Sequence, residues 1–340
     1  MKRILFITSQ YRVGERIYPI IPLLAKEYDI DLLKVYQMSN SFNWTGNIDL
    51  RKRFDETYLS YFTNVYDKFC DSSTYDLIIS DDNRPTNKTS LESIYKNAKC
   101  NVIACSHGNE ESKYTLMGYK RAYDYTFVFG SKERHEKWCI DAGIPSNDEL
   151  EHYQNIEKTH ILIIVNFLGN RSAICPVRFD EAFFNNDNLK QLQQQYKLPI
   201  AIKLKSRADE GSYINNIQYL AKIIKDLDYQ IFIDVEDDNK LIAQSACVIS
   251  APSTLALKPI QLGIPTVLIR NSGQHGVLDD YDGIFDCDED FISYIQTYQR
   301  KTKFIQDTIT GGIDYSSTAV MLSKIKQIIS YDNRTNTTGN

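Results

Sequence analysis

The chain alternates short apolar runs with segments in which apolar residues recur at helical spacing. This pattern is typical of βαβ units, in which buried parallel strands are joined by helices that cover the sheet. At 340 residues the chain exceeds the length at which one hydrophobic core usually continues to grow. The sequence therefore predicts an α/β fold with two doubly wound, Rossmann-like domains, and we expect the two domains to face a cleft.

The predicted strands lie where the apolar runs are bounded by polar or turn-forming residues. In the first half they are Arg3–Thr8, Asp31–Tyr36, Asp76–Ser80, Asn101–Ser106 and Tyr125–Phe129, and in the second half His160–Asn166, Ile200–Leu204, Gln230–Val235, Ala246–Ser250 and Thr266–Arg270. A helix with one apolar face is predicted over residues 16–28, which read RIYPIIPLLAKEY, and a final helix over Ser316–Ile329.

The alternation is interrupted between Ile144 and Lys158 by a polar segment rich in turn formers. We therefore expect an N-terminal domain over residues 1–150 and a C-terminal domain over residues 151–330. The polar residues 331–340 are expected to form a disordered tail.

Composition narrows the class of protein. Hydrophobic residues make up 42% of the chain and charged residues 24%, and no apolar run is long enough to span a bilayer. The N-terminal residues MKRILFITSQ contain too few apolar residues for a signal peptide and are predicted to form a strand. Seven cysteines without CxxC spacing favour a reducing, cytoplasmic location. The net charge of −5 argues against binding that depends on neutralising many phosphates.

The sequence lacks the GxGxxG fingerprint that brings a backbone against a pyrophosphate, but residues 250–270 offer another phosphate-binding element. They read SAPSTLALKPIQLGIPTVLIR, which predicts a helix opened by Pro252 directly after a strand. Free N–H groups, the hydroxyls of Ser253 and Thr254, and the positive end of the helix dipole would meet there. The alternative is an ordinary capped helix, because proline and serine are favoured at any helix start.

The order strand, S-x-P-S-T, helix, L-G-I-P-T-V-L-I-R resembles the C-terminal domain of GT-B-fold nucleotide-sugar enzymes. These include the CDP-glycerol glycerophosphotransferases and the non-hydrolysing UDP-N-acetylglucosamine 2-epimerases. The segments ACSHGNEES and IAIKLKSR resemble further elements of the glycerophosphotransferases. The resemblance implies that the C-terminal domain binds a nucleotide-diphosphate donor, that the N-terminal domain binds the acceptor, and that no metal or other cofactor is needed.

Basic and polar residues near the predicted helix start are candidates for donor binding. Lysine and arginine, together with helix N–H groups, can stabilise the negative charge that develops on a departing phosphate. The alternative for residues 203–211, which read KLKSRADEG, is a solvated loop with alternating charges. The full set of donor-binding candidates is Ser253, Thr254, Lys203, Lys205, Arg207, Lys258, Gln274, His275 and Gly276. Lys258 is expected either to point to solvent or to reach the anionic groups of the donor.

Transfer to a hydroxyl needs a general base, and histidine titrates close to neutral pH. His107 follows a predicted strand and precedes Gly108, so it is the first candidate, with Asp82 and Glu110 as reserve bases. Arg12 and Gly14, which follow the first strand, and Gly108 are candidates for contact with the acceptor or a phosphate.

The chain also departs from these families. The epimerases carry paired glutamates in the helix where this chain has Leu257 and Lys258, which argues against epimerase chemistry. Lys205 and Ser206 replace the His-Pro of the glycerophosphotransferases. We therefore predict a metal-independent, inverting glycosyltransferase that uses a nucleotide-sugar donor, with UDP favoured. The acceptor is expected to be a hydroxyl of a surface glycan or polymer, or of a hydroxymethylated DNA base. The alternatives are a polyol-phosphate transferase, a nucleotide-sugar 2-epimerase and a non-catalytic nucleotide-sugar-binding protein.

Overall fold

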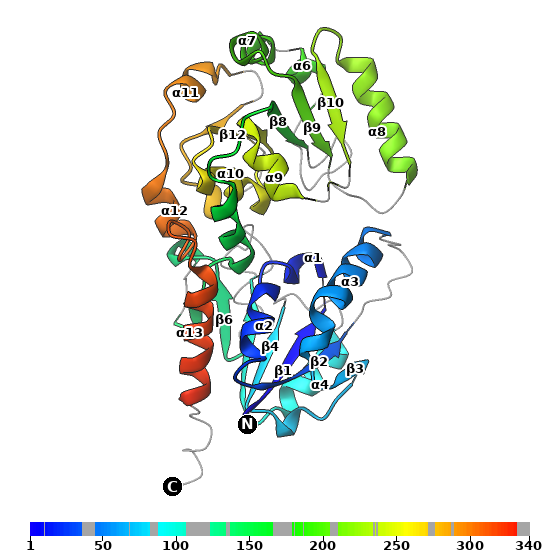
Figure 1. The fold of residues 1–340 in the computed structure, drawn as a ribbon, viewed down its shortest axis with the longest axis vertical. Helices are drawn as coiled ribbons and strands as arrows, with labels where there is room; N and C mark the ends of the chain where they lie inside the picture. The colour runs from blue at the N-terminus through cyan, green and yellow to red at the C-terminus, as the bar shows by residue number, and fades with distance from the viewer. Residues whose placement is uncertain are drawn as a thin grey trace. The chain divides into compact units, whose positions relative to one another are not determined.

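The structure is a computed structural model, and its contacts divide the chain into two compact units (Figure 1). The described residues are 1–9, 11–35, 45–67, 69–81, 88–106, 123–133, 137–165, 179, 181–185, 187–204, 210–233, 235, 237–270, 276–286 and 289–331. Unit 1 contains nearly all of residues 1–148 and the C-terminal segment that begins at Gln306, and unit 2 contains Glu149–Ile305. The expected tail lies almost wholly outside the described residues.

In unit 1 the described residues form one sheet of seven parallel strands, in the order β3-β2-β1-β4-β5-β6-β7. The strands are β1 (Arg3–Thr8), β2 (Asp29–Lys34), β3 (Val65–Asp67), β4 (Leu77–Ser80), β5 (Asn101–Cys105), β6 (Tyr125–Val128) and β7 (Cys139–Asp141). The order reverses between β1 and β4, which is the arrangement of a doubly wound sheet.

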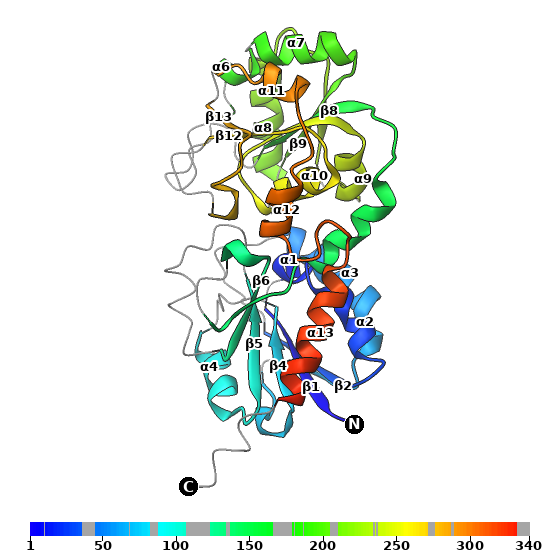
Figure 2. The ribbon, with the colours of Figure 1, turned by 90° about the vertical axis from the view of Figure 1, so that its left-hand side faces the viewer.

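The helices of unit 1 cover both faces of this sheet. They are α1 (Tyr11–Gly14), α2 (Ile21–Leu24), α3 (Thr45–Tyr58), α4 (Lys88–Asn97) and α13 (Ser317–Ser330), with 3₁₀ segments η1 (Tyr18–Ile20), η2 (Leu59–Tyr61), η3 (Ser72–Thr74), η4 (Ser131–Glu133) and η5 (Pro145–Tyr153). One face packs against α1, η1, α2, α3 and α13, and the other packs against α4. Figure 2 shows α13 running beside this sheet.

In unit 2 the described residues form six parallel strands, in the order β10-β9-β8-β11-β12-β13. The strands are β8 (His160–Val165), β9 (Ile200–Leu204), β10 (Tyr229–Phe232), β11 (Ser245–Ser250), β12 (Thr266–Ile269) and β13 (Ile284–Phe285). The helices are α6 (Glu181–Phe184), α7 (Asp187–Tyr196), α8 (Glu210–Ile223), α9 (Asp238–Ala243), α10 (Leu257–Leu262), α11 (Ile292–Gln296) and, next to the return into unit 1, α12 (Thr302–Thr308), with 3₁₀ segments η6 (Thr254–Ala256) and η7 (Gly276–Leu278).

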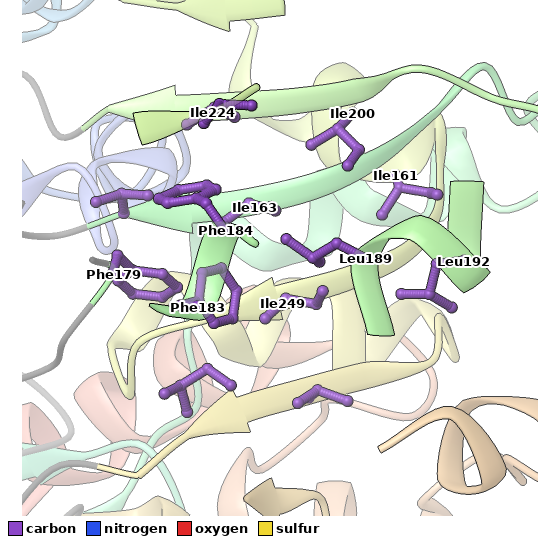
Figure 3. Packing of buried hydrophobic residues seen from close by; sticks show 14 of the residues in the cluster. Ile161, Ile163, Phe179, Phe183, Phe184, Leu189, Leu192, Ile200, Ile224 and Ile249 are labelled. Carbon is purple, nitrogen blue, oxygen red and sulfur yellow. The ribbon is translucent and has the colours of Figure 1, made fainter. Parts of the chain in front are cut away.

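Alternate residues of the unit 2 strands point to opposite faces, and each face has its own core. Ile163 and Ile249 belong to the core against α6 and α7, where Phe183 and Leu189 pack (Figure 3). The other face is covered by α9 and α10. The site described below lies where this second face meets the carboxyl ends of the strands.

The predicted fold class is confirmed, and every predicted strand is present with ends within three residues of those expected. The three strands that the sequence did not predict, β3, β7 and β13, all lie at sheet edges and contain two or three residues. Strands this short do not show a hydrophobic period. The helix predicted over residues 16–28 is divided into η1 and α2, and each begins with a proline in its first turn.

The C-terminal segment corrects the expected domain division. Residues 306–330 were expected in the second domain, but the structure places them in unit 1. The reason is the apolar face of α13, which buries Met321, Ile325 and Ile328 in the core of the unit 1 sheet. Among the described helices, none has both the length and the apolar character that crossing a membrane requires.

The start of α13 is held by the carboxylate of Asp148, a residue far from α13 in the sequence. Asp148 accepts hydrogen bonds from the backbone N–H groups of Ser317 at 3.0 Å and Thr318 at 2.7 Å. Burial raises the pKa of Asp148 because the carboxylate loses water there. Asp148 therefore fixes the point at which the returning chain docks on unit 1.

We predict that Asp148→Ala lowers the free energy of unfolding by about 1–2 kcal/mol, because two helix N–H groups lose their acceptor. Asp314→Ala is the control, since Asp314 lies near the same helix start but accepts only from the side chain of Ser316 in the described contacts. Its effect should stay within about 0.5 kcal/mol in urea unfolding. Equal effects of the two substitutions would contradict the capping role.

Candidate functional site

The strand order of unit 2 reverses between β8 and β11. In open α/β sheets, ligands bind outside the carboxyl ends of the strands at such a reversal. Strand β11 ends at Ser250, and the segment Pro252, Ser253, Thr254 follows directly. The predicted phosphate-binding element therefore lies where the fold favours a ligand.

The element is not one continuous α-helix opened by Pro252. Ser253 has an extended backbone, with φ −157° and ψ 161°, and the chain then forms the 3₁₀ turn η6, which continues into α10. Helix α10 ends at Gly263, whose φ of 75° is readily adopted only by glycine. Buried Ala256 and Ile260 hold the element on the sheet.

The hydroxyl of Ser253 is the unusual feature of this helix start. Ser253 occupies the N-cap position, but its side chain makes no capping hydrogen bond. Its Oγ is buried and has no hydrogen-bond partner among the described residues. Leaving a buried hydroxyl unpaired costs about 1–3 kcal/mol, so a bound ligand that accepts from Ser253 would remove a cost already present in the fold.

Lys203 lies on the same row of the sheet as Ser250. The strand register places Lys203 opposite Ile164 of β8, and Ile164 opposite Ser250 of β11. Lys203 is only 6% exposed, and its Nζ lies 3.3 Å from Asp238 Oδ1. A buried ammonium group is thus held near the carboxyl edge by the first residue of α9.

Lys258 is held by the next residue of α9. Its Nζ donates to Asn239 Oδ1 at 2.6 Å, a contact that the sequence did not predict, and the reach of Lys258 toward the anionic groups of a donor stays a prediction. The turn that carries Asp238 and Asn239 is itself fixed by Asp237, which accepts from the N–H of Lys240 at 2.9 Å and from the Tyr153 hydroxyl at 2.8 Å. The Asp237 carboxylate raises the pKa of Tyr153 through this bond.

The described site therefore consists of two fixed ammonium groups and an unpaired hydroxyl at a helix start (α9 and α10, Figure 1). The hydroxyl and the two ammonium groups donate hydrogen bonds, and the Asp238 carboxylate beside Lys203 balances part of the positive charge. Such a set is suited to an anion with several oxygen atoms, such as a diphosphate.

Asp238 and Asn239 were not predicted from the sequence. The available signal was the polar run DVEDDNK, which follows the strand residues of β10. Among the described residues, no cluster of histidine, cysteine, aspartate and glutamate could hold a metal ion.

Most of the remaining predicted site residues lie outside the described part of the chain, and three lie within it. His107, Gly108, Glu110, Asp82, Lys205, Arg207, Gln274 and His275 lie outside the described residues, as does the side chain of Arg12. Gly276 begins η7, and Thr254 begins η6. Gly14 has a packing role, because a Cβ atom at this position would lie 2.2 Å from the hydroxyl oxygen of Tyr18.

The sequence matches no protein-family model, and no curated protein matches it significantly. Solved structures are similar over nearly the whole chain. The UDP-GlcNAc 2-epimerase from Methanocaldococcus jannaschii is 10% identical with a TM-score of 0.62, over 97% of this chain and 99% of that chain. The UDP-GlcNAc 2-epimerase from Neisseria meningitidis bound to UDP-GlcNAc is 10% identical with a TM-score of 0.61, over 96% and 100%.

A third structure, Anabaena Alr3699/HepE in complex with UDP and glucose, is 11% identical with a TM-score of 0.55, over 97% of this chain and 100% of that chain. At these identities the similarity establishes the fold. The chain has the two-domain α/β fold of these proteins, in agreement with the resemblance seen in the sequence.

The unpaired hydroxyl gives a stability prediction that needs no ligand. Ser253→Ala should leave the free energy of unfolding unchanged or raise it by up to about 1 kcal/mol, because it removes a buried donor without a partner. Asp237→Ala is the control, since Asp237 does cap its helix, and it should lower stability by about 1 kcal/mol or more. Urea unfolding measures both, and a loss of stability in Ser253→Ala similar to that of the control would contradict the prediction.

Proposed function

We propose that the chain is an enzyme that acts on a nucleoside diphosphate sugar, and that unit 2 binds the diphosphate at the start of η6. The observation that carries this proposal is the buried, unpaired Oγ of Ser253 at the strand reversal of unit 2. A diphosphate oxygen would accept from this hydroxyl and from the N–H groups of the first turn. Lys203 of β9 and Lys258 of α10, which contact Asp238 and Asn239 of α9, would contribute positive charge.

UDP is the nucleotide that we favour. The similar structures from Neisseria meningitidis and Anabaena are described as complexes with UDP-GlcNAc and with UDP and glucose. Their identity to this chain is low, so the support for UDP comes from a common fold and not from matched residues.

The reaction that we propose first is transfer of the sugar to an acceptor hydroxyl. As the bond between sugar and phosphate breaks, negative charge develops on the departing diphosphate, and fixed N–H and ammonium groups stabilise it without rearrangement. Unit 1 would bind the acceptor, a glycan, a polymer or a hydroxymethylated DNA base. His107 is proposed as the base that takes the acceptor proton, with Asp82 and Glu110 in reserve.

Epimerisation of the sugar is the second candidate reaction, and the specific observation in its favour is the fold similarity to UDP-GlcNAc 2-epimerases. The residues of α10 favour transfer, because Leu257 and Lys258 stand where the resemblance would place glutamates. Both reactions use the same diphosphate site.

Binding is tested by calorimetry with UDP, CDP, GDP and dTDP. The parent protein should bind UDP, and Ser253→Ala should weaken binding about tenfold, because a hydrogen bond to a charged group is lost. Ser245→Ala is the matched control at the opposite end of β11, where the serine Oγ donates to the Ile242 carbonyl oxygen at 2.6 Å. It should reduce stability and leave UDP affinity unchanged. A parent protein that binds none of the four nucleotides would exclude the proposal.

The reaction is tested by proton NMR of UDP-GlcNAc and UDP-glucose incubated with the parent protein. A transferase without acceptor should release UDP slowly by transfer to water. An epimerase should instead convert UDP-GlcNAc into its C2 epimer while the sugar stays on the nucleotide. Accumulation of the epimer without free UDP would exclude transfer as the reaction.

A further inference from the structure

Unit 1 also has a strand reversal, between β1 and β4, and a buried carboxylate lies there. Asp81 follows β4 and is 0% exposed, and on the neighbouring strand Thr8 ends β1 and Ser9 follows it. Removing a carboxylate from water is costly unless hydrogen bonds replace the water. The partners of Asp81 therefore determine what this residue does.

In the described contacts, the Asp81 carboxylate accepts hydrogen bonds from residues that lie in or after β1. Asp81 Oδ1 accepts from the backbone N–H of Ser9 at 2.9 Å and from its Oγ at 2.8 Å. Asp81 Oδ2 accepts from Thr8 Oγ1 at 2.8 Å and from the Tyr18 hydroxyl at 3.2 Å. The same carboxylate thus fixes the end of β1, the first residue after it, and η1.

Tyr18 reaches Asp81 because the surrounding chain makes room for it. Its ring packs against Phe54 with centroids 4.6 Å apart, and its hydroxyl lies against the backbone of Gly14, where a side chain would clash. Burial raises the pKa of Tyr18 well above its usual value, so the hydroxyl keeps the proton that it donates. Gly14 and Tyr18 therefore hold α1 in register with Asp81.

We infer that Asp81 is a positioning residue for the reaction, acting through the turn after β1. This inference rests on the proposed function. The turn follows β1 at the reversal, where ligands of doubly wound sheets bind. It leads into α1, which contains Arg12, the candidate for acceptor contact.

The same sheet contains a matched control, Asp31 on β2. Asp31 is 2% exposed and accepts from Arg3 Nη2, the Tyr75 hydroxyl and the Asn64 side chain at 2.8–2.9 Å. Burial disfavours its charge, but these hydrogen bonds outweigh that effect and lower the pKa of Asp31. Its partners precede or begin strands, so this network lies at the opposite edge of the sheet from Asp81.

The test compares Asp81→Asn with Asp31→Asn. Both should reduce stability, because an amide replaces a buried carboxylate among donors. Only Asp81→Asn should reduce kcat per folded enzyme, by about a hundredfold, since small displacements of reacting groups have effects of this size. UDP affinity measured by calorimetry should stay within twofold of the parent in both variants. Equal kcat values for the two variants, measured well below their unfolding temperatures, would overturn the inference.

Two further variants keep the test decisive if Asp81→Asn does not fold. Thr8→Val removes one donor to Asp81 at nearly constant shape, and Thr8→Ser retains the hydroxyl. Thr8→Val should lower kcat with little change in KM for the donor, and Thr8→Ser should restore most of it. Equal kcat values for these two variants would also overturn the inference.

A measurement without nucleotide separates this inference from the proposed function. Hydrogen exchange in a peptide covering residues 9–14 should become at least about tenfold faster in Asp81→Asn than in Asp31→Asn, because the amide accepts with one oxygen only and its NH2 group meets donors where the second carboxylate oxygen was. Unchanged exchange in this peptide would show that Asp81 does not position the turn, whatever the protein binds. If exchange is faster in Asp81→Asn but the parent protein binds no nucleotide, Asp81 does position the turn and the proposed reaction is excluded.

Discussion

The constraint on which the structure depends is the pairing of parallel strands whose order reverses in the middle of each sheet. Connections leave the two central strands in opposite directions, so the carboxyl ends of these strands are not covered by a crossover helix. The described residues that follow β1, β4 and β11, namely Ser9, Asp81 and Ser253, therefore lie where the fold favours the approach of a ligand.

The buried polar groups at the two strand reversals differ in their hydrogen bonding. In unit 1, the Asp81 carboxylate is surrounded by donors from Thr8, Ser9 and Tyr18. In unit 2, the Ser253 hydroxyl has no partner within the described residues. A fully satisfied network rigidifies the segments that it joins, whereas an unpaired donor gains most when a ligand arrives. This difference fits a first unit that holds segments in place and a second unit that binds an anion.

Much of the fold could be predicted because long buried strands and amphipathic helices carry their period in the sequence. The edge strand β13 could not, because two residues show no period. The placement of α13 in unit 1 depends on which core its apolar face enters, and Met321 or Ile325 alone does not reveal that. Ser253 was proposed for donor binding from its local pattern, and that role stays a prediction. The contacts of Asp238 and Asn239 with lysines from other elements are tertiary, so the sequence did not predict these two residues.

The two lysines of unit 2 differ in a way that matters for an anion. Lys203 is paired with a carboxylate, Asp238, so its charge is largely balanced before any ligand binds. Lys258 donates to the amide oxygen of Asn239, a neutral group, in the described contacts. A diphosphate that approached Lys203 would compete with Asp238, whereas one that approached Lys258 would share the ammonium group with an amide oxygen. The Asp238 carboxylate would have to move or to remain beside a second anion when a diphosphate binds at Lys203, which lowers the contribution of this deeply buried lysine.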